Sequence, residues 1–98
     1  MALKVIWSPA AESDLDNILD YLNENWSKRV VIKFINKVED TVTLLAEDPN
    51  LFPLINNKLK VRKCVLTNQN TIFYRATKSQ IEIIRVFDTR QDPKKLDF

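Results

Sequence analysis

Two runs of β-branched and aromatic residues near the end of the chain constrain its fold more than any other feature. The runs span residues 71–76 and 81–87, and only a short polar segment, 77–80, separates them. A connection this short permits a chain reversal and little else, so the pattern predicts a β-hairpin. The second run leads into polar and charged residues at 88–92, which predicts a charged surface at that end of the hairpin.

The residues before the hairpin carry strand and helix patterns in turn. Residues 3–7 alternate as a short strand does. Ser8 followed by Pro9 predicts a helix start, because serine caps free amides and proline needs no partner in the first turn. Apolar residues at spacings of three and four continue this helix for about fifteen residues. Ser27 then begins a second helix that ends near Glu47, and a short connection makes the two helices antiparallel neighbours.

A period of two returns over residues 59–65 and predicts another strand. One face of that strand carries Lys60, Arg62 and Cys64. Residues 48–57 show no regular period and are predicted to form a loop. The apolar residues expected to tuck under the sheet are Leu51, Phe52 and Leu54. The predicted order is therefore β-α-α-β-β-β, an α+β domain of residues 1–98 with its helical hairpin on a small, mainly antiparallel sheet.

The residues that are missing exclude several classes of site. The chain has no histidine, which excludes nucleophile pairs and metal sites that depend on an imidazole. It has no glycine, which excludes glycine-rich phosphate loops. The single cysteine, Cys64, is expected to be a buried small apolar residue. We therefore expect no metal and no cofactor. The chain also lacks a membrane-length apolar run and a signal-peptide pattern, so we expect a cytoplasmic protein without membrane contact.

The net charge of +2 hides a difference between the two halves. Residues 1–50 contain nine acidic and five basic residues, whereas residues 51–98 contain ten basic and four acidic residues. A basic C-terminal half favours nucleic acid or an acidic protein segment as the partner of the sheet. Ordinary solvated surface charge explains the same pattern equally well.

In several segments, taken in order, the chain resembles the RelE/ParE superfamily of bacterial type II toxins. These segments are WSPAAESDLDNILDYL at 7–22, Trp26, Pro49, residues 61–63, residues 72–75 and IIRVFDTRQDP at 83–93. The resemblance covers essentially the whole chain. It implies a small cytoplasmic toxin that a cognate antitoxin binds and neutralises.

Two activities diverge within that superfamily. RelE-like members cut messenger RNA on the ribosome with basic side chains and often a tyrosine or glutamate. ParE-like members inhibit DNA gyrase and lack that catalytic set. A ribonuclease here would have to move protons with Tyr74, Glu82 or Asp88. The chain has no tyrosine after its last strand, which favours the ParE-like, non-catalytic alternative. A toxin that only binds its antitoxin and a basic RNA-binding module remain further alternatives.

Four basic residues are the candidates for contact with the target, whether gyrase or the ribosome with its mRNA. They are Lys60, Arg62, Arg85 and Arg90. Lys60 and Arg62 can equally protect a sheet edge from aggregation. Arg85 is expected on the same strand face as Ile81, Ile83 and Phe87, with Asp92 or a backbone carbonyl as its partner.

Arg90 follows the last apolar strand residue without a packing role, which makes it the first choice for function. Three aromatic residues are instead expected to be structural. Tyr74 is assigned to the core, and Trp7 and Trp26 are assigned to packing around the first helix.

Overall fold

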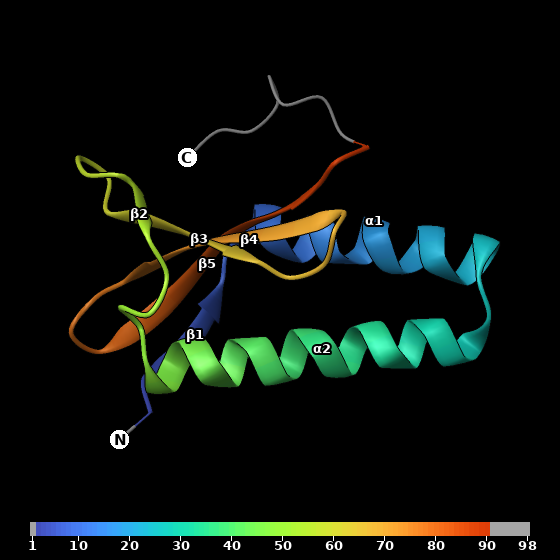
Figure 1. The fold of residues 1–98 in the computed structure, drawn as a ribbon, viewed down its shortest axis with the longest axis horizontal. Helices are drawn as coiled ribbons and strands as arrows, with labels where there is room; N and C mark the ends of the chain where they lie inside the picture. Colours follow the sequence, from blue (N-terminus) through green and yellow to red (C-terminus); the bar gives the residue numbers. More distant parts are fainter. Residues whose placement is uncertain (1, 91–98) are drawn as a thin grey trace.

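A computed structural model describes residues 2–90 and shows two helices and five strands in that range (Figure 1). The helices are α1 (Pro9–Asn25) and α2 (Lys28–Glu47). The strands are β1 (Lys4–Trp7), β2 (Leu54–Asn56), β3 (Val61–Val65), β4 (Asn70–Ala76) and β5 (Gln80–Asp88). This arrangement confirms the predicted α+β class and the predicted hairpin, which is β4 and β5, and it adds one strand, β2.

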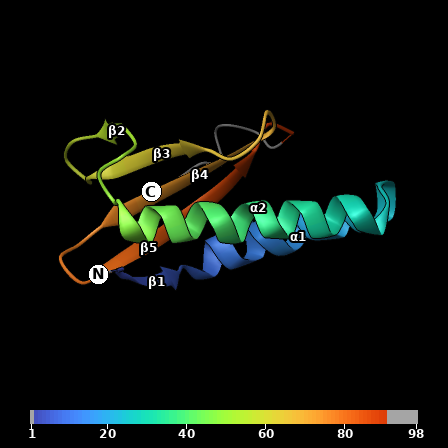
Figure 2. The ribbon, with the colours of Figure 1, turned by 60° about the horizontal axis from the view of Figure 1, so that its bottom comes forward.

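The strands form one sheet in the order β1-β5-β4-β3-β2. Only β1 and β5 run parallel among these neighbours, so the prediction of a mainly antiparallel sheet is confirmed. The helices form an antiparallel hairpin that packs beside the sheet and projects past it (Figures 1 and 2). Between hairpin and sheet lies the main core, whose buried members include Ile18, Phe34, Leu45, Ile72, Tyr74 and Ile83.

Both helices begin at the serines that the sequence indicates. The Ser8 hydroxyl oxygen accepts the Ala11 N–H at 3.0 Å, and Pro9 occupies the first turn. The Ser27 hydroxyl oxygen accepts the Val30 N–H at 3.4 Å. Each cap satisfies an amide that has no partner within its own helix. None of the described helices has the length and apolar character that crossing a membrane requires.

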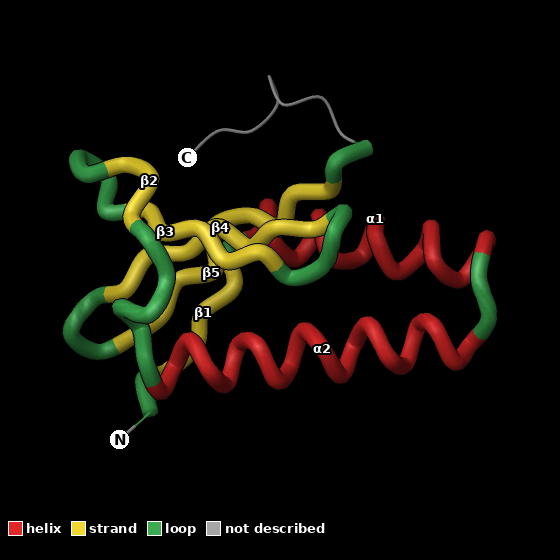
Figure 3. Tube along the Cα trace, in the orientation of Figure 1, coloured by secondary structure: helices red, strands yellow, loops and turns green. Residues whose placement is uncertain are grey.

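The expectation of a loop throughout residues 48–57 is wrong, because β2 lies inside that segment at the outer edge of the sheet (Figure 3). Leu54 is also exposed rather than tucked under the sheet, and so is Leu51, whereas Phe52 packs against the core. A turn with Lys60 at φ 59° joins β2 to β3, so Lys60 precedes the strand on which it was expected. A strand as short as β2 gives too little alternation to detect in the sequence.

A register shift bends the hairpin formed by β4 and β5. Tyr74 pairs with Ile83 and Phe73 pairs with Arg85, so Ile84 is the extra residue of a β-bulge. The buried apolar positions of β5 are therefore Ile81, Ile83 and Val86. The expectation that Arg85 shares a face with Ile81 and Ile83 is wrong, because the bulge turns the residues after it to the opposite face, and Phe87 turns with Arg85.

Candidate functional site

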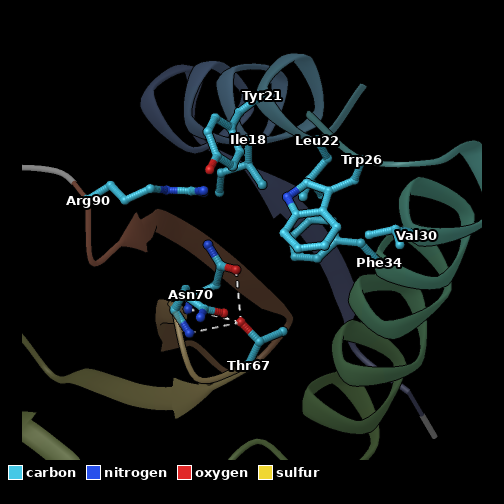
Figure 4. A pocket seen from close by; sticks show the side chains of 10 residues that line it. Ile18, Tyr21, Leu22, Trp26, Val30, Phe34, Thr67, Asn70 and Arg90 are labelled. Atoms are coloured by element: carbon cyan, nitrogen blue, oxygen red, sulfur yellow. Dashed lines mark hydrogen bonds between the residues drawn. The ribbon is translucent and has the colours of Figure 1, made fainter. Parts of the chain in front are cut away.

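A groove with a volume of about 510 Å³ lies where the helical hairpin projects past the sheet (Figure 4). We call it the hairpin groove, and its lining residues are Ile18, Tyr21, Leu22, Trp26, Val30, Phe34, Thr67, Gln69, Asn70 and Arg90. An adjoining hollow of about 360 Å³ shares Val30, Phe34 and Thr67 with it and adds Lys33 and Lys37. The result is an apolar depression with basic side chains at both ends.

The apolar wall of the groove exists because the helices are longer than the sheet they cover. Ile18 and Phe34 are buried in the core, but Tyr21 and Trp26, nearer the tip of the hairpin, are exposed. Trp26 is 58% exposed, so the expectation that it packs structurally is wrong. Trp7 does pack against the core, as predicted. An exposed aromatic cluster of this kind marks a surface that binds another molecule more often than a surface left in water.

Arg90 forms the polar end of the groove. Its Nε and its backbone N–H each donate to Asp88 Oδ1 at 2.9 Å, and its Nη2 pairs with Asp88 Oδ2. The guanidinium carbon lies 3.6 Å from the centroid of the Tyr21 ring, within the range of a cation–π contact. The expectation that Arg90 has no packing role is therefore wrong, although 41% of its side chain remains exposed.

The Asp88 carboxyl is nearly buried, with a side chain that is 6% exposed. Burial raises its pKa, but the hydrogen bonds from Arg90 outweigh that effect and hold the pKa below its usual value. A group with a lowered pKa in the folded state contributes stability above its unfolded pKa and loses that contribution as the pH falls through the folded pKa.

We therefore expect the protein to lose stability below about pH 4, the ordinary range of an aspartate, and to continue losing it until Asp88 is protonated. The check is the free energy of unfolding in urea from pH 7 to pH 3. Asp88→Asn keeps the size of the side chain without the titration, so its stability should fall less over this range. Equal acid sensitivity in both proteins would assign the effect to other carboxylates.

Arg85 is held inside the fold by α1. Its Nε and Nη2 donate to the two carboxylate oxygens of Asp14 at 2.8 and 2.9 Å, and Asp14 Oδ2 also accepts the Val86 N–H at 3.0 Å. Nearby, the Ser8 hydroxyl donates to the Ile84 carbonyl at 2.7 Å. Where β1 ends, α1 thus takes over the bonding of the β5 backbone. The expected partner Asp92 lies outside the described residues, and the partner seen is Asp14.

Arg62 and Lys60 lie at the other side of the sheet. Arg62 Nη1 donates to the Phe52 carbonyl at 2.6 Å, and its Nη2 donates to Asn50 Oδ1 at 3.1 Å, so Arg62 fastens the segment that follows α2. Lys60 is exposed in the turn before β3. Of the four candidate target contacts, Arg90 lines the hairpin groove and the other three do not.

The three residues considered for proton transfer each form hydrogen bonds within the fold. Tyr74 is fully buried in the core, as predicted, and its hydroxyl donates to the Pro49 carbonyl at 2.9 Å. Burial also raises the pKa of its phenol. Hydrogen bonds from Arg75 lower the pKa of Glu82, and those from Arg90 hold Asp88 ionised. A general acid or base works best with a pKa near the working pH.

The remaining groups within residues 2–90 that could carry chemistry are a thiol and potential metal ligands. Burial raises the pKa of the Cys64 thiol, and the side chain is 1% exposed, which confirms that it is a buried apolar residue. The described residues hold no cluster of three or more potential ligands that suits a metal ion. What the described residues present at the hairpin groove is a set of apolar walls with basic side chains at the ends.

The sequence also matches a known protein family. A family model described as the ParE toxin of the type II toxin-antitoxin system parDE matches residues 5–93. The chain belongs to the ParE toxin family. This confirms the predicted membership of the RelE/ParE superfamily.

Individual relatives of this ParE family member agree. Toxin ParE1 of Caulobacter vibrioides is 30% identical over 80 residues, which make up 81% of each chain. Toxin ParE1 of Mycobacterium tuberculosis is 23% identical over 93 residues, 94% of this chain and 95% of that protein. A solved chromosomal ParDE TA system from P. aeruginosa has the same fold, with a TM-score of 0.73 at 20% identity, over 89% of this chain and 96% of that chain.

Proposed function

We propose that this ParE family member inhibits DNA gyrase by binding it, without catalysing a reaction. The observation that carries the proposal is that the side chains a nuclease would need are bonded or buried within the fold. Arg85 and Arg62 are bonded within the fold, and the Tyr74 phenol is buried in the core. Acid-base cleavage of RNA requires such groups to be exposed beside the substrate. The names of the relatives, Toxin ParE1, point in the same direction.

The same proposal includes a cognate antitoxin that occupies the hairpin groove. A solved structure of the same fold is described as a chromosomal ParDE TA system, which supports an antitoxin partner for this chain. The groove suits an amphipathic helix, because an apolar stripe can lie along Trp26, Val30 and Phe34. Acidic residues of the helix then meet Lys33, Lys37 and Arg90 at the ends. Gyrase as the target also places the protein in the cytoplasm.

The test is a supercoiling assay with purified gyrase, relaxed plasmid and this protein, run beside primer extension on mRNA from cells that express it. We expect supercoiling to be inhibited, inhibition to be reversed by the cognate antitoxin, and mRNA to remain uncut. Codon-positioned cuts with unimpaired gyrase would establish the RelE-like alternative. Antitoxin binding without gyrase inhibition or mRNA cleavage would show that the protein is an interaction module.

A further inference from the structure

Asn70 is a buried polar residue whose side-chain nitrogen lacks a hydrogen-bond partner of normal geometry among the described residues. It opens β4 with 5% of its surface exposed, and its Nδ2 makes no hydrogen bond to any residue of the described range. The amide favours ionised Asp88 across the strand pair, but without a hydrogen bond of normal geometry. Burying an unpaired donor costs free energy, so such a group is rare unless another molecule completes it.

The orientation of this amide is fixed by its neighbour in the β3–β4 turn. Thr67 Oγ1 accepts the backbone N–H groups of Gln69 and Asn70 at 3.2 and 3.1 Å. Its two lone pairs are then used, so its hydroxyl hydrogen is what remains to bond Asn70 Oδ1 at 2.8 Å. Reversing the amide would place two donors against each other. Nδ2 therefore points away from Thr67 and into the hairpin groove (Figure 4).

A second donor lies beside it. Figure 4 shows the Arg90 guanidinium and the Asn70 amide nitrogen directed into the same part of the groove, below Ile18 and Tyr21. Nε and Nη2 of Arg90 bond Asp88, whereas Nη1 takes no part in that pairing. Because Arg90 offsets the charge of Asp88, and Lys33 and Lys37 stand at the adjoining hollow, the groove as a whole favours a negatively charged occupant.

We propose that Asn70 and Arg90 bind one carboxylate of the partner helix. Its oxygens accept from Asn70 Nδ2 and Arg90 Nη1, while apolar residues on the same helix face pack against Trp26 and Phe34. The inference rests on the proposed antitoxin groove and goes beyond it. An apolar stripe alone binds many helices, whereas a buried donor rejects a helix that brings no acceptor to that position.

The experiment measures the affinity of the cognate antitoxin for the full chain and for Asn70→Leu, which keeps the branched shape and removes the donor. We expect binding to weaken about 10- to 100-fold, as for the loss of a hydrogen bond to a charged group. The urea midpoint of the free protein should change little, because removal of the unpaired Nδ2 offsets the loss of the hydrogen bond from the Thr67 hydroxyl to Oδ1. Asn23→Leu, the same substitution at an exposed amide of α1 that does not line the groove, is the matched control and should bind normally.

The partner side tests the same contact without altering this chain. Each Asp and Glu on the antitoxin helix is changed singly to Asn or Gln, and binding is measured against the full chain and Asn70→Leu. One substitution should weaken binding to the full chain and have little further effect on Asn70→Leu.

Unchanged affinity of Asn70→Leu, or no such coupled residue, would overturn the carboxylate contact. If Trp26→Ala still weakened binding, the groove itself would stand. If the antitoxin bound equally well to both groove variants, or failed to bind the full chain, the proposed antitoxin groove would fall and this inference with it.

Discussion

Arg85→Ala should lower the free energy of unfolding by about 3–5 kcal/mol, the usual cost of removing one member of a buried ion pair. The cost arises because Asp14, with a side chain that is 6% exposed, would stay buried without the two hydrogen bonds that Arg85 donates. A loss of this size is a large part of the 5–15 kcal/mol that typically stabilises a small domain. Urea denaturation at pH 7 measures it directly.

Arg75→Ala is the matched control, because Arg75 of β4 forms an exposed ion pair with Glu82 of β5 at 2.9 Å. Its side chain and that of Glu82 are 37% and 30% exposed. Water therefore screens the pair, and its loss should cost at most about 1 kcal/mol. Equal effects of the two substitutions would show that Asp14 and Arg85 do not form a buried pair in solution.

A double substitution separates the charge from the packing. Asp14→Leu with Arg85→Met replaces both charges by apolar groups of similar length, which often restores stability at buried pairs. We expect much of the loss in Arg85→Ala to be recovered. The Val86 N–H would remain without Asp14 Oδ2, so recovery should be incomplete.

The features that could be predicted from the sequence are those that depend on neighbouring residues. Ser8 and Ser27 are caps because each stands directly before an apolar helical pattern, and the β4–β5 hairpin follows from two runs with a short polar connection. The β-bulge at Ile84 could not be predicted in this way, since it depends on how β5 meets β4 and α1. That single extra residue moved Arg85 from its expected face.

The partners of the candidate arginines also could not be predicted from neighbouring residues. Asp14 and Arg85 are 71 positions apart, so local pattern cannot pair them. One signal was nevertheless present in the sequence, because Asp14 falls on the same helical stripe as Ala11 and Ile18, which are buried. An acidic residue on an apolar stripe indicates a buried partner. The hairpin groove gave a weaker signal, namely an aromatic residue, Trp26, at the point where the first helix ends.

Trp26→Ala should weaken binding of the cognate antitoxin by about 2–4 kcal/mol, roughly 30- to 1,000-fold. Trp26 lines the hairpin groove, is 58% exposed in the free protein, and is of the residue type that most often dominates a binding interface. Because so much of it already contacts water, its removal should change the free energy of unfolding far less than the binding energy. Calorimetric titration and urea denaturation of the same samples measure the two quantities.

The control for Trp26→Ala is Ile32→Ala. Ile32 is an apolar residue of α2 with a similar exposure, 55%, but it does not line the hairpin groove. Its substitution removes exposed apolar surface from the same helical hairpin and should leave antitoxin affinity within about twofold, as for a residue outside the binding hot spot. If both variants lost affinity equally, the partner would cover the outer face of α2 instead. If only Trp26→Ala lost it, the aromatic residue that the helices carry past the sheet is what holds the antitoxin.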